Sequence, residues 1–446
     1  MSLPRYPEYK ASGVEWLGEV PGHWEVKRLK QACHVFPSNV DKKSHDGETP
    51  VNLCNYTDVY YNETITVDME FMAATATDDQ IAKFTLRAGD TIITKDSETA
   101  DDIAIGAYVP ADLPGVICGY HLSMIRPLAD TAGAFVKRLF DSTYVRSCVA
   151  VRANGLTRVG LGQYEIDNLE LPFPPLTEQQ TIAAFLDSET GKIDALIAEQ
   201  QRLVELLAEK RQAVISHAVT KGLNPNARMK DTGIEWLGEV PEHWGISQSR
   251  RMFAVRSQPA LASDRMLTAS QKHGILFQSD FVEREGRRVV EVIIGIESLK
   301  HVEPDDFIIS MRSFQGGIEW CKLRGSTSFH YVMLKPIKWV YPHFFSYLFK
   351  SITYIQALRA TTDLIRDGQE LRYSNFAQVD LPIVPIEEQK CIASFLDIEV
   401  AKFDTLTAEA NRAIALLQER RSALISAAVT GRIDVRKELT QVGITA

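Results

Sequence analysis

The sequence lacks the short motifs that mark many enzyme active sites. It has no GxxxxGK(S/T) loop for a nucleoside triphosphate and no GxSxG elbow for a nucleophilic serine. The Gly160–Gly162 pair has neither the third glycine nor the strand-then-helix setting of a dinucleotide site. An Asn/Asp-Pro-Pro-Tyr/Phe stretch of the kind used by adenine methyltransferases is missing too. Together these absences argue against a self-sufficient enzyme.

The sequence also lacks the marks of a metal site, a membrane span and a secretion signal. Its six cysteines are scattered without a CxxC pair, which indicates free thiols in a reducing compartment. The histidines show no HExxH spacing, so no metal site is expected. No apolar run approaches the roughly 20 residues that cross a bilayer, and the first residues do not resemble a signal peptide. We therefore expect a cytoplasmic protein that makes no membrane contact.

What the chain does have is a long stretch that occurs twice. Leu171–Gly222 returns as Leu381–Arg432, with roughly half of the positions identical. Neither copy is interrupted by a proline after its entry, so each predicts one long helix. Thr177 is expected to cap the first helix, with Gln180 as its partner in a capping box.

Apolar residues at steps of four and three indicate the narrow seam of a coiled coil. The predicted seam is Ile182, Leu186, Glu189, Ile193, Leu196, Gln200, Leu203, Leu207, Lys210 and Val214, and in the second copy Ile392, Leu396, Glu399, Phe403, Leu406, Ala410, Ala413, Leu417, Arg420 and Leu424. If a two-fold relates the halves, the helices are antiparallel and form a rod of about 60 Å with a globular block at each end. Two unrelated helices, or a dimerising coil, are the alternative.

A second repeat precedes each globular block. Gly13–Trp24 (GVEWLGEVPGHW), here called plug 1, and Gly233–Trp244 (GIEWLGEVPEHW), plug 2, differ at only two positions. Two tryptophans, a leucine and a proline in so short a segment favour an apolar packing motif that seats each block on a helix end. A ligand site is the weaker interpretation.

The repeats divide the chain into five parts. They are residues 1–170 (plug 1 and a first block), 171–222 (a helix), 223–380 (a linker, plug 2 and a second block), 381–432 (a helix) and 433–446 (a tail). Short β-branched runs predict strands at 64–67, 90–94, 289–294 and 307–310, and helical patterns cover 134–150 and 343–360. Each block is therefore expected to be mixed α+β.

The two blocks share polar residues at matched positions on loops after strands. Residues 90–97 match 306–313, residues 125–127 match 334–336, and residues 156–158 match 364–366. Arginine can pair with a guanine edge and glutamine with adenine, while serine and threonine contact phosphates or bases. The candidate DNA-contacting residues are Lys95, Ser97, Arg126, Thr157, Arg158, Arg312, Ser313, Gln315, Lys335, Arg366, Gln369 and Arg372. A surface salt bridge is the ordinary alternative for any one of the arginines.

The overall charge does not favour a stand-alone nucleic-acid binder. The formal net charge is −9, with an acidic first block and a basic second block. If DNA is bound, we expect a partner subunit to neutralise much of the phosphate charge.

The duplicated helix starts LPFPPLTEQQTIAAFLD and LPIVPIEEQKCIASFLD, the two plugs and the DFIISMRSFQGG stretch resemble the specificity (S) subunit of type I restriction-modification enzymes. The resemblance covers essentially the whole chain. It implies an α+β fold: two mixed α/β target recognition domains, separated by two long antiparallel coiled-coil helices in a pseudo-two-fold internal repeat. Each domain would bind one half of a bipartite double-stranded DNA site, and the subunit itself would catalyse nothing.

The same resemblance implies the partners and their cofactors. Two modification (M) subunits would dock on the helices, bind S-adenosylmethionine and methylate adenine. Restriction (R) subunits would add ATP- and Mg-dependent translocation and cleavage, so no cofactor is expected in this chain. The alternative hypothesis is a coiled-coil protein-interaction scaffold without DNA binding, which the acidic balance favours. Salt-dependent DNA binding by the complex would distinguish the two.

Overall fold

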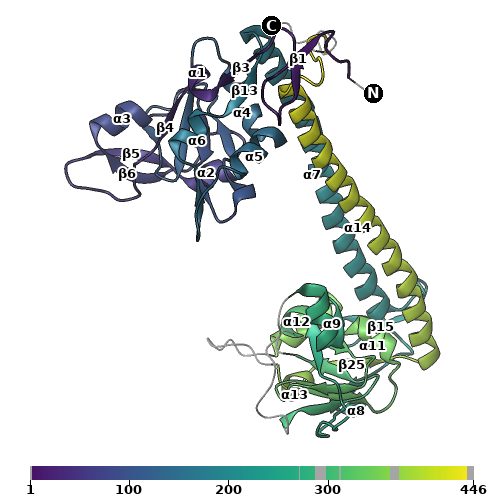
Figure 1. Ribbon diagram of the computed structural model, residues 1–446. Helices are drawn as coiled ribbons and strands as arrows, with labels where there is room; N and C mark the ends of the chain where they lie inside the picture. The colour runs from purple at the N-terminus through teal and green to yellow at the C-terminus, as the bar shows by residue number, and fades with distance from the viewer. Residues whose placement is uncertain (1–2, 271, 287–297, 311–312, 362–370, 439–446) are drawn as a thin grey trace. The chain divides into compact units, whose positions relative to one another are not determined.

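The computed structural model describes residues 3–270, 272–286, 298–310, 313–361 and 371–438. The chain forms two compact units: unit 1 comprises Met1–Gln201 with Arg412–Ala446, and unit 2 comprises Arg202–Asn411. Two long helices, α7 (Leu176–Lys221) and α14 (Ile386–Val429), each contribute one half to each unit (Figure 1). Each unit therefore holds one block, one plug and two half-helices.

A four-stranded antiparallel sheet lies at the centre of the unit 1 block. Its order is β4 (Cys33–Pro37), β11 (Leu122–Pro127), β7 (Thr91–Thr94) and β9 (Gly106–Tyr108). Side chains alternate across a strand, so Ile93 packs in the cluster with Phe135 of α4 (Gly133–Asp141), while Ile92 joins the cluster around Leu53. The sheet thus has a core on each face.

The other elements of unit 1 surround this sheet. Its remaining strands are β1 (Tyr9–Ala11), β2 (Glu19–Pro21), β3 (Glu25–Arg28), β5 (Thr49–Cys54), β6 (Met72–Ala76), β8 (Asp96–Ser97), β10 (Val116–Cys118), β12 (Val159–Gly160) and β13 (Glu170–Phe173). Its remaining helices are α1 (Leu29–Ala32), α2 (Tyr56–Tyr60), α3 (Asp78–Phe84), the 3₁₀ turn η1 (Ala100–Asp102), α5 (Thr143–Ala150) and α6 (Gln163–Asp167). Strands β10, β5 and β6 form a second, mixed sheet.

The unit 2 block has a sheet of the same design. Its order is β17 (Phe253–Val255), β24 (Val332–Pro336), β21 (Phe307–Ile309) and β22 (Glu319–Trp320), again antiparallel. The remaining strands are β14 (Met229–Asp231), β15 (Glu239–Pro241), β16 (Gly245–Gln248), β18 (Leu267–Ser270), β19 (Gly274–Phe277), β20 (Lys300–Val302), β23 (Gly325–Thr327) and β25 (Asp380–Ile383). The helices are α8 (Ser249–Met252), α9 (Gln278–Glu285), α10 (Ser313–Gly316), α11 (Pro342–Leu348), α12 (Ile352–Ala360) and α13 (Tyr373–Phe376). Both blocks are mixed, as the sequence predicts.

Several local predictions need correction. The helical patterns at 134–150 and 343–360 are each two helices, because Ser142 and Ser351 accept a hydrogen bond from the backbone three residues on and begin a new helix. Residues 64–67 form one isolated bridge rather than a strand. The strands predicted at 90–94 and 307–310 are confirmed as β7 and β21. The predicted strand at 289–294 lies outside the described residues.

The long helices begin five residues later than the repeat does. Leu171 and Phe173 belong to β13, which pairs with β3, and α7 begins at Leu176. Thr177 lies inside the helix, where the backbone N–H groups of Glu178 and Gln179 already donate to the Pro175 carbonyl. The predicted Thr177–Gln180 capping box is therefore wrong. The second helix likewise begins at Ile386, after β25.

Each plug is a packing motif at the start of a long helix, which confirms the preferred interpretation. In unit 1 Trp24 is fully buried, and its Nε1 donates to Glu178 Oε1 of α7 at 3.1 Å. In unit 2 Trp244 is also fully buried, and its Nε1 donates to Glu388 Oε2 of α14 at 3.0 Å. The histidine before each tryptophan pairs with the same glutamate, at 2.7 and 2.8 Å.

The residue after each of these glutamates ties the helix to the block. Gln179 accepts from the Ala132 N–H at 2.8 Å and donates to the Pro174 carbonyl at 2.9 Å. Gln389 accepts from the Tyr341 N–H at 2.7 Å and donates to the Val384 carbonyl at 2.8 Å. The Glu-Gln pair in both helix starts is therefore explained by anchoring.

Each plug also packs against the end of the other long helix. In unit 1, Gly431 follows α14 in the left-handed region (φ 74°), and an added Cβ would lie 2.3 Å from Pro21 Cδ of plug 1. In unit 2, Gly222 follows α7 with φ 72° and lies against Pro241 and Trp244 of plug 2. A plug thus covers the start of one long helix and the end of the other.

The two long helices lie side by side within each unit. In unit 1, Arg421 Nε of α14 donates to Asp194 Oδ1 of α7 at 2.9 Å. In unit 2, Arg211 Nε of α7 lies 3.4 Å from Asp404 Oδ1 of α14. The two pairs are formed by equivalent positions of the repeat, because 211 corresponds to 421 and 194 corresponds to 404.

Only part of the predicted seam is buried. Ile182, Leu186, Ile193 and Leu207 of α7 are at most 9% exposed, as are Ile392, Leu396, Phe403 and Ala410 of α14. By contrast Leu196, Leu203 and Leu406 are 46, 41 and 47% exposed. A pair of helices therefore leaves leucines of the expected seam open on its surface.

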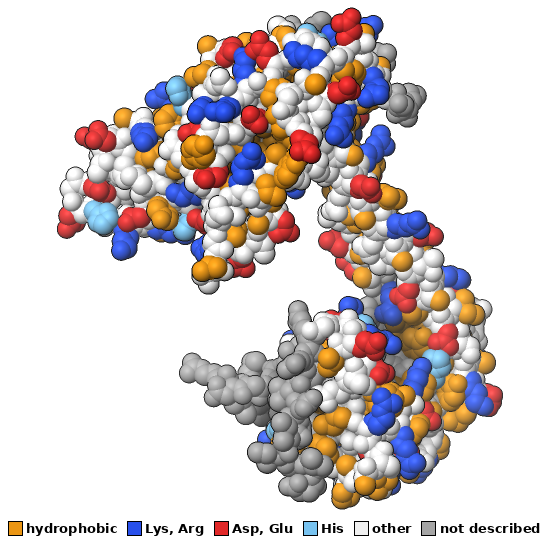
Figure 2. All heavy atoms as spheres, viewed as in Figure 1, with side chains coloured by type: hydrophobic (Ala, Val, Ile, Leu, Met, Phe, Trp, Pro, Cys, Tyr) orange, Lys and Arg blue, Asp and Glu red, His pale blue; other side chains and the backbone are white. Residues whose placement is uncertain are grey.

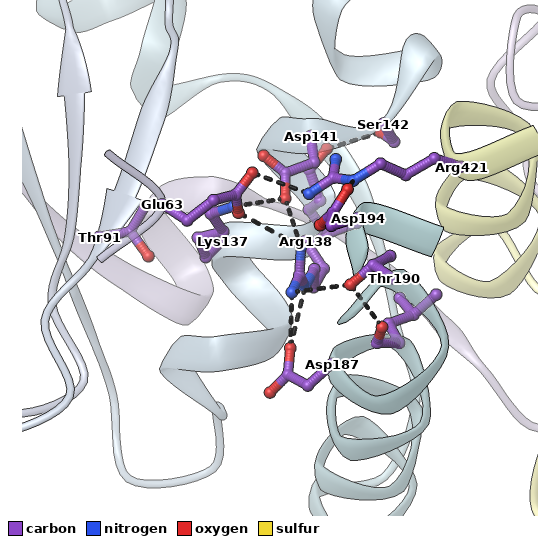
Figure 3. A network of polar contacts seen from close by, with 12 residues as sticks. Glu63, Thr91, Lys137, Arg138, Asp141, Ser142, Asp187, Thr190, Asp194 and Arg421 are labelled. Carbon is purple, nitrogen blue, oxygen red and sulfur yellow. Dashed lines mark hydrogen bonds and ion pairs between the residues drawn. The ribbon is translucent and has the colours of Figure 1, made fainter. Parts of the chain in front are cut away.

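A polar network fixes the unit 1 block on the helices (Figure 3). Arg138 of α4 donates to Asp187 of α7 at 2.7 Å and to Asp141 at 3.1 Å. Glu63 joins Lys137 to Arg421 of α14, the latter at 2.9 Å. Burial would raise the pKa of Glu63, but Lys137, Arg421 and Arg138 outweigh it and lower the pKa to about 2. The carboxylate is held ionised between block and helix.

Candidate nucleic-acid interface

A short strand pair in unit 1 brings together residues that are far apart in the sequence. Strand β8 pairs antiparallel with β12, so that Ser97 lies opposite Val159 and Asp96 opposite Gly160. This places Lys95 and Ser97 beside Thr157 and Arg158. Four of the candidate DNA-contacting residues therefore share one edge of the block.

The loop from Asn154 to Gly160 projects at this edge. Its ends are closed by two backbone hydrogen bonds between Asn154 and Gly160, at 3.1 and 2.9 Å. Gly155 has φ 153°, and an added Cβ would lie 1.8 Å from the Arg158 carbonyl oxygen, so the tight turn requires glycine. Leu156 is fully exposed, and Thr157 and Arg158 are exposed beside it. The turn therefore presents an apolar, a hydroxyl and a guanidinium group to solvent.

Asp96 orients the arginine of this loop. Arg158 Nη2 donates to Asp96 Oδ1 at 3.0 Å, and His121 Nδ1 lies 2.7 Å from Asp96 Oδ2. The Arg158 side chain is 55% exposed, so the ion pair contributes little to stability. A guanidinium held in this way keeps donors free for a base edge or a phosphate.

Lys95 is partly buried at the same edge. Its Nζ donates to the Ser38 carbonyl at 2.8 Å and lies 4.5 Å from the centre of the Tyr120 ring. Burial lowers the pKa of Lys95. Tyr120 is itself 51% exposed, and its ring lies edge to face with that of His121, with centroids 5.0 Å apart.

Ser97 supports a tyrosine cluster rather than facing solvent. It is only 3% exposed. Burial raises the pKa of Tyr56, and a hydrogen bond with the Ser97 hydroxyl opposes that rise. Tyr56 stacks on Tyr60, whose Oη donates to Asp102 Oδ2 at 2.9 Å. Ser97 is therefore better placed to position the tyrosine cluster than to contact a ligand.

Arg126 lies elsewhere, in a structural ion pair. Its Nε and Nη2 donate to the two carboxylate oxygens of Asp90 at 2.8 and 2.7 Å, and Nη2 also donates to the Thr85 carbonyl. Asp90 is fully buried. Removing one member of such a pair leaves the other buried and uncompensated, so the geometry gives Arg126 a packing role.

In unit 2 the candidates are only partly described. Ser313 is buried and its Oγ accepts from the Ser310 N–H at 2.8 Å, which makes it a helix-start residue. Gln315 on α10, Lys335 on β24 and Arg372 before α13 are exposed. The candidates Arg312, Arg366 and Gln369 lie outside the described residues.

Charge of both signs is spread over the surface. Figure 2 shows basic and acidic side chains interspersed on the viewed face of each unit. Within the described part of the chain, no group of three or more His, Cys, Asp or Glu side chains is arranged to hold a metal ion. None of the described helices, α7 and α14 included, is apolar enough over a sufficient length to cross a bilayer. All six cysteines are free thiols.

Asp96, His121 and Tyr120 are the neighbours that sequence reasoning missed. Asp96 lies within the matched stretch 90–97, and its position between the candidates Lys95 and Ser97 could have indicated that it belongs to the site. His121 and Tyr120 carried no such signal, because their contact with Lys95 and Asp96 depends on a bend between β10 and β11.

The matching family model and the similar proteins are described in the same terms. Residues 21–206 match the family model described as the type I restriction modification DNA specificity domain. A protein of Methanocaldococcus jannaschii, described as the type I restriction enzyme MjaX specificity subunit, is 21% identical over 94% of this chain and 96% of its own length. The EcoKI specificity subunit of Escherichia coli is 26% identical over 29% of this chain and 25% of its length.

Solved structures show the same fold. A chain from a study of the complex assembly and conformational transition of the type I R-M system superposes with a TM-score of 0.66 at 17% identity. It covers 92% of this chain and 98% of that one. The HsdS subunit from Thermoanaerobacter tengcongensis has a TM-score of 0.51, with the same coverage and identity.

Residues 21–206 therefore match a type I DNA specificity domain, and nearly the whole chain is similar to the specificity subunit of a type I restriction enzyme. These descriptions name a DNA specificity domain and specificity subunits, which is the class of protein that the sequence resembles.

Proposed function

We propose that the chain selects a bipartite DNA target, with the block of unit 1 binding one half-site and the block of unit 2 the other. The observation that carries this proposal is the combination of a repeated frame with unlike loops. Both blocks have the same four-stranded sheet and the same Glu-Gln anchor, yet Lys95 and Asp96 after β7 stand opposite Met311 and Arg312 in the matched sequence of unit 2. Related readers of different sequences would have this pattern.

We further propose that α7 and α14 form an antiparallel coiled-coil spacer with a pseudo-two-fold axis. The equivalent ion pairs Arg421–Asp194 and Arg211–Asp404 support it, because each unit holds the start of one helix beside the end of the other. A two-fold exchange maps either pair onto the other. Such a spacer would set the number of base pairs between the half-sites.

In unit 1 the proposed DNA contacts are Arg158, Thr157 and Lys95. Arg158 would exchange one hydrogen bond to Asp96 for a guanine edge or a phosphate, and Tyr120 would pack against the sugar or base beside it. In unit 2 we propose Gln315, Lys335 and Arg372, which are exposed. Arg312, Arg366 and Gln369 stay sequence-based proposals.

The partners we propose are two modification subunits and the restriction subunits. Exposed leucines at equivalent positions of both helices, Leu196 with Leu406 and Leu206 with Leu416, support docking of further helices. S-adenosylmethionine, ATP and Mg would bind to those partners, and the complex would act on DNA in the cytoplasm. The acidic net charge of this chain fits a reader whose partners neutralise most of the phosphates.

The test is the pattern of methylated adenine in cells that express the modification subunit with or without this chain. With the chain, sequencing should show one bipartite motif, and without it that motif should be unmethylated. A chain that acted only as a protein scaffold would leave the motif unchanged. Salt titration of DNA binding by the purified complex should give a steep negative slope.

A further inference from the structure

The identity of the two plugs is only partly explained by packing. Leu17, Val20 and Trp24 of plug 1 and their counterparts in plug 2 are at most 3% exposed, so the core accounts for them. The same is not true of Glu15, Trp16 and Glu19, here called plug surface 1, or of Glu235, Trp236 and Glu239, plug surface 2. Trp16 is 55% exposed, the four glutamates are exposed, and Trp236 is half-buried.

The ring of Trp236 packs edge-on against Tyr354, with ring centroids 5.5 Å apart, but the polar groups of these surface residues are not engaged by the described part of this chain. Among the described residues, none of the four glutamates makes a side-chain hydrogen bond or ion pair. Trp236 Nε1 is buried but has no hydrogen-bond partner there. An indole N–H can only donate, and a buried donor without an acceptor is costly. Plug surface 2 therefore lacks an acceptor.

Each plug tryptophan also lines a cavity at the same place in its unit. In unit 2, Trp236 lines a cavity of about 480 Å³ with Thr353 and Gln356 of α12. In unit 1, Trp16 lines a cavity of about 350 Å³ with Tyr144 and Ser147 of α5. These helix residues are equivalent, since Tyr144 and Thr353 both lie two positions after the capping serine, and Ser147 and Gln356 five positions after it.

Because the two plug surfaces have the same residues, they limit which kind of ligand could bind to both. Two half-sites of DNA would differ, and the exposed carboxylates would repel phosphate. A ligand bound in the same way by both units must present the same surface twice. Its chemistry is a basic and apolar segment with a carbonyl or carboxylate that accepts from the indole N–H. The modification subunit satisfies the condition of presenting the same surface twice, because two copies are present under the proposed function.

We propose that plug surfaces 1 and 2 each dock one modification subunit through a basic, apolar segment whose side chain enters the cavity beside the plug tryptophan. The inference rests on the proposed function. It adds a second contact to the proposed docking on the long helices, at the site where each block joins them.

The experiment co-purifies the chain with its modification subunit and counts subunits by native mass spectrometry. Trp16→Ala is expected to leave complexes with one modification subunit, with binding at that site at least tenfold weaker. Glu15→Lys with Glu19→Lys should have the same effect. Glu235→Lys with Glu239→Lys should remove the subunit at the other site, and it tests plug surface 2 without disturbing the half-buried Trp236.

Matched controls use exposed aromatic residues away from the plugs, Tyr164→Ala in unit 1 and Phe329→Ala in unit 2, which are 75 and 47% exposed. Both should retain two modification subunits. Full occupancy in the plug variants would overturn the inference, as would selective loss of a restriction subunit or a change in self-association. The proposed function is tested separately, because the unaltered complex must methylate the bipartite motif whatever these variants show.

Discussion

Units 1 and 2 use the same helix position to hold a block but different chemistry to do so. Asp187 of α7 pairs with Arg138 at 2.7 Å, whereas the equivalent Asp397 of α14 accepts from Tyr347 Oη at 2.7 Å and pairs with His343 at 3.0 Å. The carboxylate is kept on both helices while its partners on the blocks have changed. The helix surface is therefore the constant part of the frame, and the blocks have adapted to it.

A second comparison explains the buried aspartates that precede equivalent strands. Asp90, before β7, pairs with Arg126 of β11, while Asp306, before β21, pairs with Arg256 just after β17 at 2.6 and 2.9 Å. Each block neutralises the same buried carboxylate with an arginine from a different strand. Lys335, at the position of Arg126, is consequently left exposed in unit 2.

The largest expected effect comes from disrupting the packing of one plug against the long helices while the other plug stays intact. Trp24→Ala should cost about 3–5 kcal/mol, because it removes a fully buried indole and a hydrogen bond to Glu178. Trp244→Ala is the matched change in unit 2. Hydrogen exchange should show each variant losing protection in its own unit, and equal losses in both units would contradict independent packing of the two plugs.

The block anchors should differ in strength. Arg138→Ala should destabilise unit 1 by about 3 kcal/mol, because Asp141 and Asp187 lose a largely buried partner. Tyr347→Phe, which removes one hydrogen bond to Asp397, should cost about 1 kcal/mol in unit 2. Urea unfolding measures both values. Similar losses of stability in the two variants would show that the Arg138–Asp187 and Tyr347–Asp397 contacts stabilise their units equally.

Arg158→Ala should relax recognition at one half-site only. A paired arginine contact is worth about 1–3 kcal/mol of base discrimination. Methylation sequencing should show degenerate bases in one half of the motif while the other half stays intact. Arg152→Ala is the control, since Arg152 Nη1 donates to the Cys148 carbonyl inside the unit. Degeneracy in both halves, or in neither, would argue against separate readers.

The smallest effect concerns acid stability. Glu63 has its pKa lowered to about 2 from an ordinary 4.5, so its stabilisation is complete above that ordinary value and is lost as the pH falls toward 2. The side chain is 54% exposed, which limits the contribution to under about 1 kcal/mol. Glu63→Gln should reduce stability at neutral pH and flatten the acid decline of unit 1. An unchanged acid profile would show that the network contributes nothing there.

The parts that sequence predicts well are those with long, regular patterns. The helices, the buried plug tryptophans and the strands β7 and β21 follow from repeats and alternation. The pairing of Ser97 with Val159 could not be predicted, because nothing local links strands 62 positions apart. The ion pair that occupies Arg126 depends on a register between β11 and the start of β7. A serine that begins a new helix, as Ser142 does, interrupts a pattern that otherwise indicates one long helix.

The proposed function requires the two long helices to hold two different DNA-binding blocks a fixed distance apart. Inserting seven residues after Gln201 of α7 and seven after Asn411 of α14, at equivalent positions, preserves the seam and adds about 10 Å. An equal-length replacement of the neighbouring residues is the control. Because ~34 Å is one turn of about ten base pairs, methylation sequencing should show the same two half-sites with about three more base pairs between them. An unchanged spacer, with methylation retained, would contradict the account.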